Sequence, residues 1–568
     1  MNKLLAIRFI VCCFILFGTT ISAQVSTWEW AKSERDTLDD VTKSVAIDAF
    51  GNTYVTGYFC GASITIGSTT LFNIANNSSG NLSDMLLVKY DPSGNILWAK
   101  NAGEFLPDAG NSVTVDAFDN IIVVGYFQSS YIAFGTDTLT NLSGGAEIFI
   151  VKYDSLGNVL WAKNAGGNSD DGLVSAISTD ASGNCYITGN FKSPTITFGS
   201  ITLTNANSNG YVADMFIAKY DSSGNVLWAN SVGGMNDESA NAIITDASGN
   251  SYVAGEFRSS AITFGATTLN NASTNYYDIF LVKYDALGNV LWATKAGGLS
   301  DDRATGVSKD NAGNSYITGD FASSSLVFGS TTLINAGSSD LFLAKYDPSG
   351  NALWANSNGG SVSDGANSVA VDASGIIYVA GYFSSSNITF GSTTLYNSGM
   401  FSDIFVVQYD VFGNAVWATT AAGGTRDAIN SIVVDASGDV YVAGYFYSST
   451  LAIGTFLLPN YNGTEKEANM FTAKIGKTDN VINYTVAEGN IISIFPNPSS
   501  GIFHLEINNG TASNAEIEIY DVLGKIVFKS VILNSETNID LSSAAKGIYF
   551  YHVVNETGTV GTGKLVVK

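Results

Sequence analysis

The sequence predicts an all-β protein, a seven-bladed β-propeller closed by an N-terminal strand and followed by a small Ig-like β-sandwich. Three observations lead to this prediction. One phrase recurs seven times along the chain. Each copy alternates apolar and polar residues with the period of two that strands require. The composition also suits many tight turns between strands, with 59 glycines and only 7 prolines among 568 residues.

The N-terminus predicts a secretory signal peptide over residues 1–23. Lys3 and Arg8 form its basic region, residues 9–17 form its apolar region, and Ala23 ends a small-residue cleavage site. The alternative, a membrane anchor, needs about 20 apolar residues, and this run is shorter. We therefore expect export across the inner membrane, with no transmembrane segment left after cleavage.

The cysteines do not form a disulfide framework. Cys12 and Cys13 leave with the predicted signal peptide, and the repeats place Cys60 and Cys185 in blades that are not adjacent. We therefore expect no disulfide between them, although the compartment is oxidising.

Residues 24–476 contain the repeats that predict the propeller. The Asp-x-x-Gly-Asn part of the repeated phrase is a hairpin turn. A second such turn precedes a strand that ends at tryptophan, at roughly 64-residue intervals. A Gly- and Thr-rich piece, such as Ile262–Leu269, predicts a short additional hairpin. The seven copies of the phrase lie at Asp48–Phe59, Asp116–Phe127, Asp180–Phe191, Asp246–Phe257, Asp310–Phe321, Asp372–Phe383 and Asp435–Phe446.

The ends of the repeat region favour a closed ring over an open solenoid. Only Trp28–Lys32 precedes the first full phrase, and the last copy stops at Asn469–Gly476. Joining these pieces completes a seventh blade, and closure protects the sheet edges. The repeats resemble those of bacterial β-propeller repeat (SBBP-like) proteins found in secreted and surface proteins. That resemblance implies the fold and no single activity.

After a polar linker at residues 477–490, residues 491–568 alternate as a small β-sandwich. Four motifs in order (Phe-Pro-Asn-Pro, Tyr-Asp-x-x-Gly-Lys, Gly-Ile-Tyr and the ending Lys-Leu-Val-Val-Lys) resemble the type A C-terminal sorting domain of the type IX secretion system of Bacteroidetes. The resemblance implies handling by the type IX secretion machinery and a secreted or outer-membrane-attached product. The alternative is a carbohydrate-binding sandwich. The residues that carry the sorting signal are Pro496, Asn497, Pro498, Gly524, Lys525, Gly547, Tyr549 and Lys564.

The charge and the histidine content exclude two classes of function. Asp and Glu outnumber Lys and Arg by 50 to 26, a formal net charge of −24 that repels phosphate backbones, so we expect no nucleic-acid partner. The two histidines, His504 and His552, both lie in the C-terminal sandwich. A Ser-His-Asp triad, a His-ligated zinc ion and a histidine general base are therefore excluded from the propeller.

The seven aspartates of the repeated turn resemble a metal ring, but we interpret them as structural. Each stands where an Asx turn needs a side chain that accepts the N–H groups of its own turn. We predict no bound metal and no cofactor. Calcium held by loop carboxylates such as Asp170, Asp171, Asp301 and Asp302 is the alternative. The turn aspartates are Asp48, Asp116, Asp180, Asp246, Asp310, Asp372 and Asp435.

Function in a repeat protein should lie where the repeat is broken, and one position meets this condition. In a closed ring its four tyrosines are contiguous and face an arc of hydrogen-bonding residues, which suits a sugar or a peptide. The alternative is that the polar blades are recent copies of one another. The residues at this position, directly after the repeated glycine, are Tyr58, Tyr126, Asn190, Glu256, Asp320, Tyr382 and Tyr445.

Two enzymatic alternatives depend on small sets of charged residues. Glu256 and Asp320, in adjacent blades, would serve a glycosidase if their carboxylates lie about 5–10 Å apart. Arg35, Arg303 and Arg426 fall in corresponding loops after the tryptophan strand, as in the arginine triad of a sialidase, but the turns lack the sialidase Asp-box spacing. We interpret these arginines as partners of neighbouring acids, and the repeated glycines as close packing between blades.

We therefore expect a secreted or cell-surface β-propeller that acts as a binding or adhesion scaffold, with an extracellular glycan or a surface protein as ligand. The loops of one face carry most of the length variation, so binding belongs there. One alternative is an extracellular polysaccharide hydrolase or lyase that uses Glu256 and Asp320. The other is a structural component of the cell surface or the motility apparatus. We favour a binding protein over an enzyme.

Overall fold

A computed structural model describes residues 27–34, 38–74, 82–141, 144–171, 173–207, 209–460, 466–477, 491–508, 515–521, 525–532, 536–555 and 558–568. The chain divides into two compact units, residues 1–478 and 479–568. Every regular element in the described ranges is a β-strand, and they contain no helix long and apolar enough to cross a membrane. The predicted signal peptide at 1–23, with Cys12 and Cys13, lies outside the described residues.

The first unit is a β-propeller of antiparallel sheets that share one design, and the described residues contain seven of them. Six of these sheets hold four strands, hydrogen-bonded in the order first, second, third, fourth, and the seventh has the same four strands and a two-stranded hairpin hydrogen-bonded to its fourth strand. The first strands contact one another in succession around the centre. They are β2 (Asp40–Ile47), β8 (Asp108–Val115), β14 (Leu173–Thr179), β20 (Glu238–Thr245), β26 (Asp302–Lys309), β32 (Asp364–Val371) and β38 (Asp427–Val434).

The other three strands of each sheet follow outward from the centre. The second strands are β3 (Thr53–Phe59), β9 (Ile121–Phe127), β15 (Cys185–Phe191), β21 (Ser251–Phe257), β27 (Ser315–Phe321), β33 (Ile377–Phe383) and β39 (Val440–Phe446). The third strands are β6 (Asp84–Tyr90), β12 (Glu147–Tyr153), β18 (Asp214–Tyr220), β24 (Asp278–Tyr284), β30 (Asp340–Tyr346), β36 (Asp403–Tyr409) and β42 (Asn469–Gly476). The fourth strands are β7 (Ile96–Ala102), β13 (Val159–Gly166), β19 (Val226–Val232), β25 (Val290–Ala296), β31 (Ala352–Asn358), β37 (Ala415–Ala421) and β1 (Thr27–Lys32).

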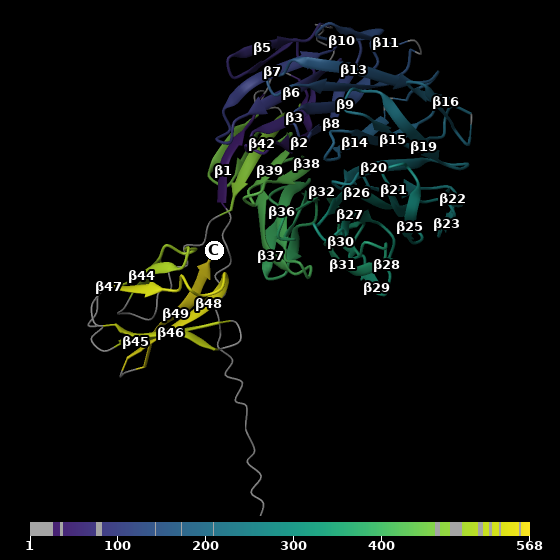
Figure 1. The fold of residues 1–568 in the computed structure, drawn as a ribbon. Helices are drawn as coiled ribbons and strands as arrows, with labels where there is room; N and C mark the ends of the chain where they lie inside the picture. Colours follow the sequence, from purple (N-terminus) through teal and green to yellow (C-terminus); the bar gives the residue numbers. More distant parts are fainter. Residues whose placement is uncertain are drawn as a thin grey trace, which may run out of the picture. The chain divides into compact units, whose positions relative to one another are not determined.

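The N-terminal strand completes the last sheet. β1 pairs antiparallel with β42, with Trp28 opposite Ile475, in the place that the missing strand of the last repeat predicts. In Figure 1 the purple first sheet accordingly lies beside the green last one. A hydrogen bond from Asn430 Nδ2 to the carbonyl of Thr42 (2.7 Å) also joins the first strands of these two sheets.

A two-stranded hairpin accompanies each sheet, as the Gly- and Thr-rich pieces predict. Its turn needs a glycine with positive φ, such as Gly265 at +56°. The hairpins are β4 (Ser63–Ile66) with β5 (Thr69–Phe72), β10 (Tyr131–Phe134) with β11 (Asp137–Thr140), β16 (Thr195–Phe198) with β17 (Ile201–Thr204), β22 (Ala261–Phe264) with β23 (Thr267–Asn270), β28 (Ser325–Phe328) with β29 (Thr331–Ile334), β34 (Asn387–Phe390) with β35 (Thr393–Tyr396), and β40 (Thr450–Ile453) with β41 (Phe456–Pro459).

The aspartates of the repeated turns hold those turns together. Asp48 Oδ1 accepts the backbone N–H groups of Phe50 (3.0 Å) and Asn52 (2.9 Å), and Asp48 Oδ2 accepts the amide of Asn52 (2.7 Å). The carboxylates of Asp180 and Asp310 accept the corresponding groups of their own turns. The structural interpretation of these aspartates is therefore confirmed.

The repeated glycines are required for a reason other than the close packing between blades that the sequence predicted. A Cβ on Gly57 would overlap the carbonyl oxygen of Val41, and a Cβ on Gly255 would overlap that of Ser239. Both carbonyls belong to the first strand of the same sheet, so the close approach is within a blade. The clusters between sheets consist of larger side chains, such as Phe59 packed with Tyr441.

Each junction between neighbouring sheets buries two polar side chains, nearly all of them carboxylic acids. One lies at or just before the start of a first strand, and the other begins the third strand of the preceding sheet. Asp108 is typical, because it accepts the N–H groups of Glu104 (2.9 Å) and Gln128 (3.1 Å) and the hydroxyl of Ser129 (2.8 Å). The first group is Asp40, Asp108, Asp171, Glu238, Asp302, Asp364 and Asp427, and the second is Asp84, Glu147, Asp214, Asp278, Asp340, Asp403 and Asn469.

The second unit contains two antiparallel sheets. One sheet has the order β43 (Ile491–Phe495), β44 (Ile502–Asn508), β47 (Glu536–Asp540). The other has the order β46 (Ile526–Ile532), β45 (Ala515–Tyr520), β48 (Gly547–Asn555), β49 (Gly558–Val567). Buried apolar side chains of both sheets, including Phe503 and Leu505 of one and Ile517 and Leu565 of the other, form a single core.

Candidate functional site

The residues predicted to break the repeat symmetry occupy the same register in every sheet. Each is the sixth residue of a second strand and is half-buried. Each lies opposite the second residue of β2, β8, β20, β26, β32 or β38, or the first residue of β14. We call this set the mouth ring. It consists of Tyr58, Tyr126, Asn190, Glu256, Asp320, Tyr382 and Tyr445.

A β-bulge in every first strand creates a second ring at the centre. One extra residue interrupts the register of each pair of first and second strands. Bulges re-aim the extra side chain, and these side chains line a central channel. We call this set the belt. It consists of Lys43, Asn111, Ser175, Asn241, Thr305, Asn367 and Asn430.

Most belt residues link neighbouring sheets. Asn111 Nδ2 donates to the carbonyl of Val174 (2.8 Å), and Asn241 Nδ2 donates to that of Ala304 (2.9 Å). Thr305, Asn367 and Asn430 donate to the equivalent carbonyls of the next first strand. The belt therefore holds the sheets at a fixed spacing around the channel.

Lys43 departs from this pattern, because its ammonium group lies 5.6 Å from the ring centre of Tyr58 in the mouth ring. The first strands around the channel lower its pKa by withdrawing it from bulk water. No carboxylate within the described residues forms an ion pair with it. Lys43 lines a cavity of about 430 Å³ together with Asn190 and Ser239, so this cation faces the mouth ring.

One arc of the mouth ring is charged. Arg303 is paired with Asp320 across β26 and β27, and its Nε lies 3.4 Å from Glu256 Oε2. Its Nη2 lies 3.6 Å from Asp301 Oδ2, and its guanidinium lies over the ring of Tyr277 at 5.6 Å. The positive group thus stands among three carboxylates and an aromatic face.

Burial is the largest influence on the pKa values of the two carboxyl groups in this arc, Glu256 and Asp320. It raises the pKa of Glu256 to about 7, against the lowering effect of Arg303 and with a further increase from the charge of Asp320. It raises the pKa of Asp320 to about 6 in the same way. Both carboxyl groups therefore change charge between about pH 5 and pH 8.

Three polar atoms near this arc are buried without a hydrogen-bond partner among the described residues. They are Asn190 Oδ1, Glu256 Oε2 and Arg303 Nε. Asn190 Nδ2 donates to Ser239 Oγ (2.8 Å), so only one end of its amide is satisfied. Buried polar groups are nearly always hydrogen-bonded in folded proteins, and exceptions mark functional positions or ordered water.

The opposite arc of the mouth ring is aromatic. The charge of Tyr126 affects the pKa of Tyr58, and that of Tyr445 affects the pKa of Tyr382, so neighbouring members lie close together. Burial is the main cause that raises all four of these pKa values, and the tyrosines stay neutral at physiological pH. Tyr445 also makes an edge contact with Tyr447, with ring centres 5.8 Å apart.

The prediction that Arg35, Arg303 and Arg426 lie in corresponding loops is only partly correct. Arg303 is the second residue of β26 rather than a loop residue, and it forms ion pairs with Glu256 and with its neighbour Asp301. Arg426 precedes β38 and lies near Tyr445. Arg35 is outside the described residues.

The loop carboxylates considered for calcium bind the backbone. Asp171 accepts the N–H groups of Lys192 and Ser193, and Asp302 accepts that of Gly298. No group of three or more His, Cys, Asp or Glu side chains in the described part of the chain could hold a metal ion. Cys60 and Cys185 are buried, and within the described residues no disulfide joins them.

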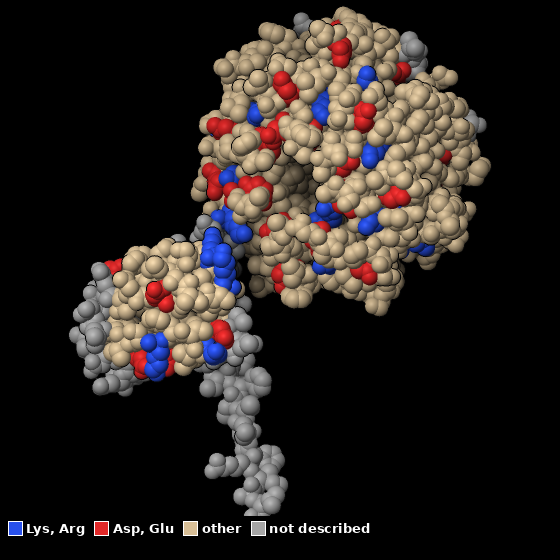
Figure 2. Space-filling model, viewed as in Figure 1, with Lys and Arg blue, Asp and Glu red and all other residues tan. Residues whose placement is uncertain are grey.

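Sequence reasoning missed the belt, including Lys43, and placed Arg303 in a loop instead of beside the mouth ring. The available signal was a Lys, Asn, Ser or Thr residue at the same place in every repeat. Figure 2 shows Lys, Arg, Asp and Glu scattered over a face made mainly of other residues.

The predicted sorting motifs stabilise the second unit. Asn497 Nδ2 donates to the carbonyl of Lys564 (2.7 Å), and Val566 N–H donates to Asn497 Oδ1 (2.9 Å). Tyr549 donates its hydroxyl to the carbonyl of Ala545. Pro496, Pro498 and Gly547 lie in the same unit, and the N–H of Lys525 donates to Asp521 Oδ1 (2.9 Å), while Gly524 falls outside the described residues.

The chain thus combines a β-propeller with a sorting domain. Residues 493–568 match the family described as the secretion system C-terminal sorting domain. The chain is therefore exported by the type IX secretion system and is a secreted or outer-membrane-attached cell-surface protein.

Two curated relatives match much of the chain. An uncharacterized WD repeat-containing protein of Acanthamoeba polyphaga mimivirus is 28% identical over 445 residues, which cover 66% of this chain and 32% of the relative. The regulatory protein FlaEY of Caulobacter vibrioides is 27% identical over 264 residues, which cover 43% of this chain and 27% of the relative. The chain thus spans a third or less of the length of these relatives.

Two solved structures are also similar. The WD40 domain of Neurospora crassa Pan2 is 9% identical, with 80% of this chain and 96% of that chain covered and a TM-score of 0.40. PorZ, a bacterial surface component of the type IX secretion system of Porphyromonas gingivalis, is 11% identical, with 94% of this chain and 99% of that chain covered and a TM-score of 0.17.

Proposed function

We propose that this chain is a surface recognition or adhesion protein that binds an extracellular glycan or surface protein at the mouth ring. The observation that carries the proposal is the buried Asn190 Oδ1, which has no hydrogen-bond partner among the described residues, together with the ion pair of Glu256 and Arg303 on the same arc. Asn190 Oδ1 offers an acceptor, and Glu256 Oε2 and Arg303 Nε, which lie 3.4 Å apart and make no hydrogen bond within the described residues, offer an acceptor and a donor. A polar ligand that enters the mouth would satisfy them, which gives binding energy and orientation.

The aromatic arc supplies the second part of a binding surface. Tyr382 lies close to both Asp320 and Tyr445, so a ligand reaching across the mouth would meet an aromatic face and a carboxylate together. Sugar rings and peptide side chains use this combination of stacking and directed hydrogen bonds.

We also infer a closed seven-bladed propeller, followed by an Ig-like sandwich, in a bacterial surface protein of the SBBP-like class from Bacteroidetes. The bond from Asn430 to Thr42 and the pairing of β1 with β42 support the ring. The two packed sheets of the second unit support the sandwich. The boundaries remain 24–476 for the propeller, 477–490 for the linker and 491–568 for the sorting domain, after a signal peptide at 1–23.

A hydrolase or lyase that uses Glu256 and Asp320 is the second candidate. The pKa of about 7 for Glu256 suits a general acid. Two-carboxylate hydrolases, however, need environments that separate the acidities of the pair, and burial raises the pKa of Asp320 as well. Arg303 beside Glu256 favours a binding role, because a guanidinium stabilises the charged carboxylate.

The test is a binding screen of the full-length protein against a glycan array and envelope fractions, with and without calcium. Arg303→Gln and Tyr445→Ala should each weaken a specific interaction at least tenfold. Tyr396→Ala is the matched control, because Tyr396 is an exposed tyrosine on the outer strand β35 and its loss should leave binding unchanged.

Three outcomes would contradict the proposal. Binding that is unchanged in both mouth variants would place recognition elsewhere. Degradation of a polysaccharide that is lost in Glu256→Gln would favour the hydrolase. Concentration-dependent self-association without any ligand would favour the alternative of a structural component of the cell surface or the motility apparatus.

A further inference from the structure

A second departure from the repeat symmetry lies at the end of the second strands that is opposite to the mouth ring. It concerns a position that is tyrosine in six of the seven sheets. Six second strands carry a buried tyrosine one residue after their start, and its ring centre lies 6.0–6.5 Å from that of a fourth-strand tryptophan. A third-strand lysine lies 4.6–5.5 Å above five of these rings. The tyrosines are Tyr54, Tyr186, Tyr252, Tyr316, Tyr378 and Tyr441.

One sheet lacks this ring. In β9 the position is Ile122, while the lysine and the tryptophan are kept as Lys152 and Trp161. Ile122 is fully buried, and its side chain is shorter than the tyrosine of the other six sheets. The sheet therefore has both partners of an aromatic ring without the ring itself.

The ionic contacts have changed accordingly. In four of the other sheets the tyrosine hydroxyl donates to the turn aspartate, as Tyr186 does to Asp180 Oδ2 (3.0 Å). Next to Tyr186, the ammonium group of Lys219 lies 3.6 Å from the same oxygen. Without that hydroxyl, Lys152 Nζ approaches Asp116 Oδ2 to 2.7 Å. The buried charges are thus paired, and the adjoining surface is left neutral and aromatic.

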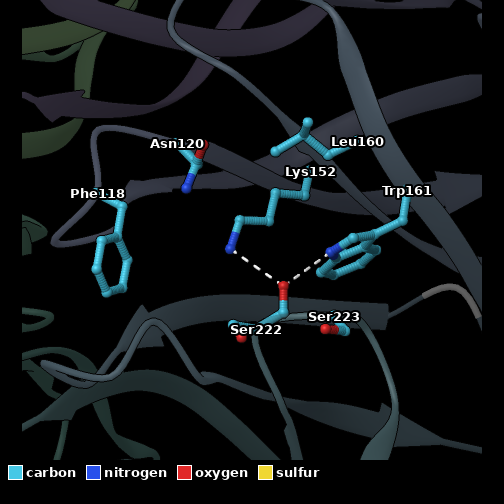
Figure 3. A pocket seen from close by; sticks show the side chains of 7 residues that line it. All are labelled: Phe118, Asn120, Lys152, Leu160, Trp161, Ser222 and Ser223. Atoms are coloured by element: carbon cyan, nitrogen blue, oxygen red, sulfur yellow. Dashed lines mark hydrogen bonds between the residues drawn. The ribbon is translucent and has the colours of Figure 1, made fainter.

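An open pocket of about 490 Å³ lies at this place, within the size range of ligand pockets. Figure 3 shows Phe118 and Trp161 on opposite sides with Lys152 between them. Lys152 Nζ (3.3 Å) and Trp161 Nε1 (3.1 Å) both donate to the carbonyl of Ser222, so this wall is fixed. Phe118 is 63% exposed and Leu160 is 52% exposed, so the entrance is apolar.

The turn that carries Phe118 is unusual as well. Asp119 has a φ of +60°, the only positive φ of a residue other than glycine in the described ranges. The corresponding turns have glycine there, such as Gly51 and Gly249. Asp is one of the few L-residues that adopt this conformation as single residues, so this turn keeps the backbone shape of the glycine turns and carries Phe118 beside Asp119.

We propose that this pocket binds a phenol ring, the side chain of a tyrosine presented by a partner protein. The ring would lie against Trp161 and beside the Lys152 ammonium, with the partners that the chain's own tyrosines have in the other sheets. Aromatic contacts and a nearby cation both favour such a ring. The site is separate from the mouth ring, because Ile122 and Tyr126 lie at opposite ends of β9.

The test uses full-length protein in which the 8 tryptophans carry a 5-fluoro label for fluorine NMR. Loss of one signal in Trp161→Phe identifies the resonance of Trp161. The probes are 4-methylphenol and N-acetyl-tyrosinamide, and the control is N-acetyl-leucinamide. We expect a saturable shift of the Trp161 signal alone, with a Kd of about 1–10 mM for ligands of this size.

Two reciprocal variants make the test specific. Ile122→Tyr restores the residue of the other six sheets, fills the pocket from inside and should abolish the shift. Tyr252→Ile should create a second responsive tryptophan, Trp292, whose ring centre is 6.1 Å from that of Tyr252. If either variant fails to fold, Phe118→Ala, which changes an exposed side chain, should weaken the Trp161 response at least threefold.

The proposal is overturned if neither phenol shifts the Trp161 signal, or if the shift persists unchanged in Ile122→Tyr. It is also overturned if N-acetyl-leucinamide or a neutral methyl hexoside shifts the signal as strongly as 4-methylphenol. Because the mouth-ring variants lie in other strands, loss of binding in Arg303→Gln with an intact phenol response would separate the two sites.

Discussion

The buried acids between the sheets predict an inverted pH dependence of stability, and Asp84 shows it best. Asp84 is fully buried at the start of β6. Burial raises its pKa to about 7, and the charge of Asp108 raises it further, against the lowering effect of the Asn101 amide. Most aspartates in proteins have lowered pKa values and lose stability in acid, so Asp84 should behave in the opposite way.

The sign follows from proton binding. Between about pH 4 and pH 7 the folded state holds a proton on Asp84 that the unfolded chain releases. The resulting stability is fully present below pH 4 and is lost as the pH rises through 7. A pKa of about 7 in place of 3.8 corresponds to roughly 4 kcal/mol, an upper figure because the pair with Asp108 titrates together.

Asp84→Asn removes the ionisation while keeping the shape of the side chain. The guanidinium midpoint of the variant should exceed that of the unchanged protein at pH 8 and match it at about pH 3, below the pKa of Asp84 in the unfolded chain. Asp91→Asn is the control of opposite sign, because Asp91 is an exposed turn residue whose pKa is lowered by hydrogen bonds from Asn95 and Ser93. An Asp84→Asn variant that is less stable at both pH values would refute the reasoning.

Three further predictions concern packing and charge. Gly255→Ala should destabilise the propeller by several kcal/mol, seen as a lower melting temperature, because the new methyl group overlaps the Ser239 carbonyl; unchanged melting would contradict the geometry. Arg303→Met should raise the pKa of Glu256 above about 7 in a carbon NMR titration of its carboxyl group, and a fall would mean that the guanidinium does not act on it. Trp30→Ala should cost about 3–5 kcal/mol in denaturant unfolding, because Trp30 is buried in the junction that joins the last sheet to the first, and a cost below 1 kcal/mol would mean that β1 is dispensable.

Local chemistry made much of the fold predictable. The Asp48 turn follows from an Asx side chain and a glycine, and the place of β1 follows from a repeat that lacks one strand. These inferences need only neighbours in sequence and the period of a strand. The same reasoning could name Glu256 and Asp320 as exceptions in a repeat, since a departure from a pattern is visible in the sequence alone.

The features that the sequence analysis missed depend on the register in which the strands pair. The bulge that turns Lys43 toward the channel inserts one residue into β2, and no distinctive sequence marks it. A simple alternation of side chains along the strand therefore assigns the direction of the Lys43 side chain wrongly. The same bulge brings the Val41 carbonyl over Gly57, which explains why the glycine contact lies within a sheet. Arg303 was assigned to a loop because strand ends cannot be located from pattern to within a few residues.

The pairing of β1 with β42 also sets an order of events in time. Trp28 is made early and Ile475, its partner, late, so at about 5–20 residues per second of synthesis the two are separated by roughly 20–90 seconds. During that interval β1 has no strand to pair with, and its edge is open to other chains. β1, the first strand to be synthesised, is therefore among the last strands to pair. The N-terminal residues of this protein have to stay unpaired until the last sheet has formed.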